Sequence, residues 1–110
     1  LGLYARYYDN AREVTWPVGS LKPTGPGFYD LHGNVHEFCQ PIGHFGRNEY
    51  DIRRFDEEPG EPYTVTETSC IPIRGGSIYS RAILTRCSAE RYVAPDSARE
   101  FAGFRLAHNH

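Results

Sequence analysis

The acids with the most informative spacing lie in a glycine-rich segment, residues 25–40. Asp30 and Glu37 stand seven positions apart in it, and Gly33, Val35 and Glu37 alternate at a period of two. If that piece is extended, the carbonyls of Gly33 and Val35 and the carboxylate of Glu37 converge from one side. Asp30 can close the ring from across the turn. Two carboxylates and two carbonyls are hard oxygen ligands, the kind that calcium takes.

The same segment has a second interpretation that needs no metal. An Asp-x-x-Gly-Asn turn followed by a half-buried strand explains the same residues. The pattern is not that of an EF-hand, which requires oxygen side chains at alternate early positions. His32 and His36 stand four apart, a metal-binding spacing on a helix, but Gly33 and Asn34 between them favour a turn.

Four motifs give the sequence a family resemblance. Residues 27–40 read G-F-Y-D-L-H-G-N-V-H-E-F-C-Q and resemble the G-L-x-D-M-x-G-N-V-W-E-W signature of the formylglycine-generating enzyme (sulfatase-modifying factor) family. Residues 15–23 are similar to its T-x-P-V-G-x-x-x-P-N lead-in. Residues 74–77 are similar to its R-G-G-S-W/Y motif. P-D at 95–96 and G-F-R-L at 103–106 resemble its closing motifs.

The resemblance implies an α+β fold of the C-type-lectin-like kind, loop-rich with short antiparallel strands. It also implies that the positions matching the calcium ligands of the family are Asp30, Gly33, Val35 and Glu37. Family domains are usually more than twice this long. We therefore interpret residues 1–110 as the C-terminal portion of one sulfatase-modifying-factor-like domain that lacks its N-terminal half, with a complete mini-domain as the alternative.

The window after the Gly-Gly-Ser motif bears on catalysis. In catalytic members of the family, two cysteines shortly after this motif bind copper and carry out the oxidation, because thiolates suit a soft cuprous ion. Residues 78–86 of this chain contain no cysteine, and Ser80 stands where the first is expected. Cys87 resembles a structural position of the family. We predict that the formylglycine reaction is absent and that no copper is bound.

Composition limits the possible domain organisation and the kinds of site that the chain can hold. The 110 residues allow one domain, and 11 Gly and 8 Pro predict many turns. Three cysteines, an odd number without paired spacing, indicate neither a zinc site nor a disulfide framework and favour reduced thiols, as in the cytoplasm. No apolar run is long enough to cross a membrane.

The net charge of −2 is unevenly distributed. Residues 1–70 hold six Lys or Arg and eleven Asp or Glu, whereas residues 71–110 hold six Arg and three acids. Arg without Lys suits fixed ion pairs, and no basic stripe with interleaved aromatics indicates nucleic acid. Arg105 is expected to be half-buried and paired with either Glu37 or Asp96.

Secondary structure is expected in several segments. Residues 63–68 alternate and are β-branched, which predicts a strand that pairs with 71–74. Pro72 would place the second strand at a sheet edge. Residues 88–98 are expected to form a polar, partly helical connection, and 101–107 the closing strand. Trp16 is expected in the core.

Two functions remain open. The first is a non-catalytic, calcium-organised scaffold that displays a ligand-binding surface, as in family domains fused to bacterial kinases. Its partners would be the rest of the domain, a fused domain such as a kinase, or a protein or small-molecule ligand, and its display residues would be Tyr79, Arg81, Arg91 and Tyr92. The alternative is part of an oxidoreductase of the wider family, of the formylglycine-generating or non-heme-iron sulfoxide-forming type, with catalytic residues outside this fragment.

Overall fold

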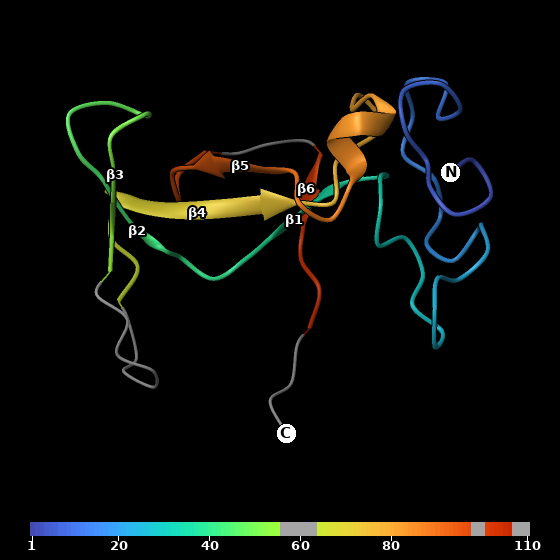
Figure 1. Ribbon diagram of the computed structural model, residues 1–110, viewed down its shortest axis with the longest axis horizontal. Helices are drawn as coiled ribbons and strands as arrows, with labels where there is room; N and C mark the ends of the chain where they lie inside the picture. The colour runs from blue at the N-terminus through green and yellow to red at the C-terminus, as the bar shows by residue number, and fades with distance from the viewer. Residues whose placement is uncertain (56–63, 98–100, 107–110) are drawn as a thin grey trace.

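A computed structural model describes residues 1–55, 64–97 and 101–106. In these ranges the chain forms short strands and one 3-10 helix (Figure 1): β1 (His36–Phe38), β2 (Gly43–Phe45), β3 (Ile52–Arg54), β4 (Ser69–Arg74), η1 (Ala82–Thr85), β5 (Glu90–Val93) and β6 (Ala102–Gly103). Across the described ranges, no helix has the length and apolar character needed to cross a membrane.

Strand β4 is the centre of the sheet (Figure 1). Strand β5 runs antiparallel along one edge of β4, with Pro72 opposite Tyr92. Along the other edge β1 pairs with the C-terminal end of β4 and β2 with its N-terminal end, both antiparallel. Strand β3 continues the sheet beyond β2, and β6 continues it beyond β1. The expected strand at 71–74 is therefore confirmed as part of β4.

The prediction that Pro72 lies at a sheet edge is wrong, because β4 has neighbours on both sides. Proline cannot donate to a ladder and is normally excluded from such a position. Pro72 lies opposite the irregular segment between the end of β1 and the start of β2. Its carbonyl accepts from Cys39 N at 2.9 Å, and the irregular segment requires no donor from the proline nitrogen.

The prediction of a strand at 63–68 is also wrong for residues 64–68. Residues 64–66 have no regular structure and 67–68 form a turn, while residue 63 lies outside the described ranges. Thr66 N donates to Ser69 Oγ at 2.8 Å, and Ser69 N donates to the Thr66 carbonyl at 3.0 Å. Hydroxyl side chains that bond locally to the backbone compete with strand pairing, which explains the turn.

The C-terminal third differs from expectation in two ways. Strand β5 occupies residues 90–93 of the expected partly helical connection 88–98, and residue 98 lies outside the described ranges. The closing strand is confined to β6, which pairs with β1 in parallel, and residue 107 lies outside the described ranges. The fold is otherwise as expected: an α+β, loop-rich structure in which the remaining strand pairs are antiparallel.

The first third of the chain is built of loops that Asn34 ties together. The Asn34 side chain accepts from Trp16 N at 2.9 Å and donates to the Trp16 carbonyl at 3.1 Å. Its backbone N donates to the Arg6 carbonyl at 2.6 Å, and its carbonyl accepts from Ile78 N at 3.0 Å. Trp16 is half-buried rather than in the core, and the Arg6 guanidinium stacks over its ring at 3.9 Å. The small apolar core contains Ala5, Ala11, Cys70, Ile73, Ile78 and Val93.

Candidate functional site

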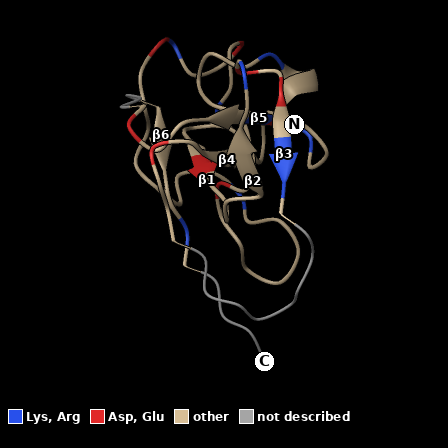
Figure 2. Ribbon diagram, turned by 90° about the vertical axis from the view of Figure 1, so that its left-hand side faces the viewer, with Lys and Arg blue, Asp and Glu red and all other residues tan. Residues whose placement is uncertain are grey.

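The four predicted calcium ligands lie around one pocket of about 480 Å³. Its wall includes Asp30, Gly33, Val35 and Glu37, and the closing segment contributes Arg105. We call this the Asp30–Glu37 pocket. Glu37 lies on β1, opposite Arg74 at the end of β4. In Figure 2 the acidic residue of β1 is drawn in red. The fold therefore brings residues 30–37 together with Arg105, which lies 68 positions beyond Glu37.

The backbone of this segment is less extended than the alternating pattern suggested. Asp30, Gly33 and Asn34 all have positive φ, at 54°, 78° and 63°, and β1 begins only at His36. Gly33 is required by close approach as well as by its φ. A Cβ there would lie 2.0 Å from the Arg6 carbonyl oxygen, and Gly33 N donates to the Gly75 carbonyl at 2.7 Å.

The expected partner of Arg105 is Glu37 rather than Asp96. Arg105 Nε lies 3.1 and 2.9 Å from the two carboxylate oxygens of Glu37, and Nη2 lies 2.6 Å from Oε1. Nη2 also donates to the carbonyls of Tyr29 at 2.9 Å and Asp30 at 3.2 Å. The hydrogen bond to Glu37 raises the pKa of the Arg105 guanidinium. This pair joins the acidic front of the sequence, residues 1–70, to the arginine-rich remainder.

The oxygens of this pocket are of the kind that calcium binds, but Arg105 shares them. One oxygen of Asp30 accepts from Gly19 N at 2.7 Å, and Arg105 contacts both oxygens of Glu37. Two carboxylates and one guanidinium leave a net charge of −1. Among the described residues, no group of three or more His, Cys, Asp or Glu side chains could hold a metal. A calcium ion here would therefore depend on carbonyl oxygens for much of its coordination, which calcium tolerates.

The position expected for the first copper-binding thiol is occupied by a structural serine. Ser80 is 7% exposed, and its Oγ accepts from Ser77 N at 2.9 Å. Ser80 N donates to the Ser77 carbonyl at 2.9 Å, and the Ser80 carbonyl accepts from Tyr8 N at 3.0 Å. The hydroxyl thus closes a buried turn that follows Gly75 and Gly76.

A second polar group was not predicted from the sequence. Glu90 on β5 pairs with Arg74 on β4 and accepts from the Tyr92 hydroxyl, which lies 3.4 Å from Arg54 Nη2. These residues lie at or beside a pocket of about 960 Å³ next to the first one, with Glu37 in the wall of both. The alternation of Glu90 and Tyr92 in a β-forming run was the signal that could have revealed it.

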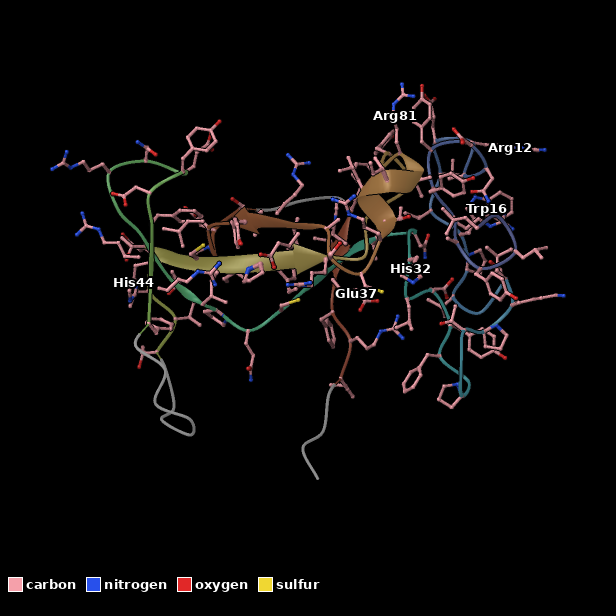
Figure 3. All side chains as sticks on the ribbon, in the orientation of Figure 1. Arg12, Trp16, His32, Glu37, His44 and Arg81 are labelled. Carbon is pink, nitrogen blue, oxygen red and sulfur yellow. The ribbon has the colours of Figure 1, made fainter. Side chains whose placement is uncertain are left out.

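The four proposed display residues differ in their exposure to solvent. Tyr79, Arg81 and Arg91 are exposed, with Tyr79 at 47%. Tyr92 is half-buried, and its hydroxyl is engaged by Glu90. Arg81 lies over the Tyr8 ring at 5.1 Å, near the turn that Ser80 closes (Figure 3).

Comparison with known proteins agrees with the fold and motifs. The chain is 33% identical over 95 residues to the serine/threonine-protein kinase pkn1 of Chlamydia pneumoniae, covering 86% of this chain and 15% of the kinase. The solved structure of Treponema denticola variable protein 1 superimposes with a TM-score of 0.67 at 26% identity, covering 94% of this chain and 35% of that protein. The chain thus spans well under half the length of either. Residues 2–110 match the sulfatase-modifying factor enzyme 1-like domain, and the chain belongs to that family.

Proposed function

We propose that this chain is a non-catalytic domain of its family, a calcium-organised scaffold that presents a binding surface. The observation that carries the non-catalytic part is the turn at Ser77 and Ser80. The side chain at the expected thiolate position is a buried hydroxyl that accepts a backbone hydrogen bond, and residues 77–86 contain no cysteine. A hydroxyl does not replace a thiolate as a ligand for a soft cuprous ion.

The calcium part of the proposal is supported by the donor set of the Asp30–Glu37 pocket. Asp30 and Glu37 would supply charge, and Gly33 and Val35 would supply backbone oxygens. The ion would add a second link between the turn at Asp30 and strand β1, beside the one that Arg105 makes. Its role would be structural, because it would hold this loop segment against the end of the sheet.

The binding surface would lie on the side chains that the fold leaves exposed around η1 and β5. Tyr79, Arg81 and Arg91 combine aromatic and guanidinium groups, which are enriched at the energetic centres of interfaces. The similarity to a protein kinase that is much longer than this chain supports a domain that works beside another in one polypeptide. Its ligand would be a protein or a small molecule.

An activity assay tests the non-catalytic proposal. The chain is incubated with copper, oxygen and a Cys-x-Pro-x-Arg peptide, beside an active formylglycine-generating enzyme as positive control, and the peptide mass is measured. We expect the thiol peptide to remain unchanged with this chain and to become the aldehyde with the control. Conversion by this chain would overturn the proposal.

A further inference from the structure

One face of the sheet carries a row of charged side chains that crosses several strands. Side chains alternate along a strand, so residues paired in register share a face. Glu37 on β1, Arg74 on β4 and Glu90 on β5 are successive partners in the register. Arg105 extends the row, because it follows Gly103, the partner of Glu37 on β6, by two positions. The charges of this row therefore alternate in sign across four strands.

Each carboxylate of the row is paired with a guanidinium. Arg105 Nε lies 3.1 and 2.9 Å from the two carboxylate oxygens of Glu37. Arg74 Nη2 pairs with Glu90 Oε2, and the other oxygen of Glu90 accepts from the Tyr92 hydroxyl. Two glutamates and two arginines give the row a net charge of zero.

Arg54 on β3 brings a further positive charge to the same face. Arg54 lies opposite Gly43 on β2, and Gly43 lies opposite Cys70 on β4. Cys70 and Arg74 are four positions apart in β4 and therefore share a face. Gly43 has no side chain to block the path across β2, and Arg54 Nη2 lies 3.4 Å from the Tyr92 hydroxyl on β5. In the part of the chain that the structure describes, Arg54 pairs with no carboxylate.

These charged side chains lie in the wall of the pocket of about 960 Å³. Arg54, Arg74 and Arg105 outnumber Glu37 and Glu90 there, which leaves a net charge of +1. Figure 2 shows β3 in blue and the acidic residue of β1 in red, with β2 and β4 between them. The wall also contains the apolar residues Leu31, Pro41, Ile42, Pro72 and Leu106. A concave surface with one spare cation and apolar walls suits a ligand with one negative charge and an apolar body.

We propose that this pocket binds small organic monocarboxylates with an apolar body and that Arg54 recognises the carboxylate. A guanidinium can donate to both oxygens of a carboxylate at once, which gives a strong and directional contact. A phosphate group carries nearly two negative charges at neutral pH, and the carboxylates of Glu37 and Glu90 would oppose the second one. The net charge of the wall therefore favours a monoanion.

The test measures binding of 3-phenylpropionate to the whole 110-residue chain by ligand-observed NMR at pH 7. The neutral 3-phenylpropionamide has the same shape without the charge, and phenyl phosphate carries the larger charge. EDTA is present throughout, so that divalent ions do not occupy the Asp30–Glu37 pocket. We expect saturable binding of the carboxylate at least about tenfold tighter than that of the amide, the loss of one charge-assisted hydrogen bond. Phenyl phosphate should bind more weakly than the carboxylate.

Arg54→Gln and Arg53→Gln are matched variants, because each removes one positive charge from an exposed position of β3. Arg53 alternates with Arg54, so it lies on the opposite face of the strand, and it pairs with Asp51 at 3.6 Å. Arg54→Gln should weaken binding of 3-phenylpropionate by about tenfold, whereas Arg53→Gln should leave it unchanged. Urea denaturation of both variants checks that the fold is retained.

Arg81→Gln separates this pocket from the proposed display surface, and it should also leave binding unchanged. The proposal is overturned if the amide binds as tightly as the carboxylate, or if millimolar 3-phenylpropionate shows no saturable binding. It is equally overturned if Arg53→Gln or Arg81→Gln weakens binding as much as Arg54→Gln, because the contact would then be general charge attraction or lie on the display surface. Tighter binding of phenyl phosphate would identify a phosphate site instead and overturn the carboxylate class.

Discussion

Arg105 reaches across 68 positions of sequence to place its guanidinium against both carboxylate oxygens of Glu37. The same guanidinium donates to the carbonyls of Tyr29 and Asp30, so one side chain fastens the closing segment to the turn at Asp30. The side chains of the pair are 34% and 25% exposed. The planar fork of arginine matches these acceptors together, whereas the ammonium of lysine presents a single point of charge.

Arg105→Lys should therefore lower the free energy of unfolding by on the order of 1 kcal/mol, because the two-point contact and one carbonyl contact are lost. Urea denaturation at low salt measures the change. Arg53→Lys is the matched control, since Arg53 and Asp51 pair at 3.6 Å with side chains 68% and 37% exposed. That control should cost less than about 0.5 kcal/mol. Equal losses in both variants would show that the Glu37 contact is an ordinary surface pair.

Gly33→Ala should destabilise the chain by more than about 2 kcal/mol, because it combines a positive φ with a clash against the Arg6 carbonyl. Gly25→Ala separates the two causes, since Gly25 has φ of 54° but no atom within 4 Å of an added Cβ. It should cost only the strain of the left-handed conformation, about 1 kcal/mol. Thermal or urea denaturation of the two variants measures which of them is destabilised more. A smaller loss at Gly33 than at Gly25 would contradict the close approach of Arg6.

Some of these relationships were predictable because they depend on residue type alone. The strand at 71–74 follows from β-propensity, and opposite charge limits the partner of Arg105 to Glu37 or Asp96 without choosing between them. Other features depend on partners that a sequence does not reveal. Residues 64–68 have strand-forming residues, but local Thr66 and Ser69 hydrogen bonds replace the ladder.

The missed features share a long-range cause. Pro72 is tolerated in a central strand only because an irregular segment lies opposite it, and β6 pairs with β1 in parallel through contacts between distant residues. Cys87 Sγ and His32 Nε2 likewise lie 4.0 Å apart although 55 positions separate them. Motif order predicted the family, but spacing could not show that Arg105 would share the Glu37 carboxylate.

Tyr92→Phe should change the pH dependence of stability. The hydrogen bond to Glu90, followed by burial, raises the pKa of Tyr92 above the usual tyrosine value of about 10. The unfolded chain then loses this proton at lower pH than the folded chain, so the contribution is complete below pH ~10 and is lost as pH rises through the folded pKa.

The measurement for Tyr92 is urea denaturation of parent and variant from pH 7 to 11.5. At pH 7 the variant should be less stable by about 1 kcal/mol, because the hydroxyl that Glu90 accepts from is absent. Above pH ~10 the difference should shrink, since only the parent loses the interaction as the pH rises. A difference that stays constant across this range would show that the hydroxyl contributes nothing through Glu90.

Calcium should raise the melting temperature if it binds in the Asp30–Glu37 pocket. The expected gain is ~2.7 kcal/mol at a hundredfold excess over the dissociation constant. Magnesium should have a much smaller effect, because it is small, requires octahedral geometry and dehydrates reluctantly. Thermal denaturation in EDTA, magnesium and calcium measures the three states.

Two variants decide whether any calcium effect comes from this pocket. Glu37→Gln keeps the shape of the side chain and removes one of the two negative charges, so the calcium shift should disappear. Val35→Ala should keep most of the shift, because that position would offer only its backbone oxygen. Glu37→Gln also weakens the contact with Arg105, so each variant is compared with itself in EDTA. If calcium shifts Glu37→Gln as far as the parent, or shifts neither, the net charge of −1 that Arg105 leaves is too small to hold the ion, and the guanidinium alone links the Asp30 turn to β1.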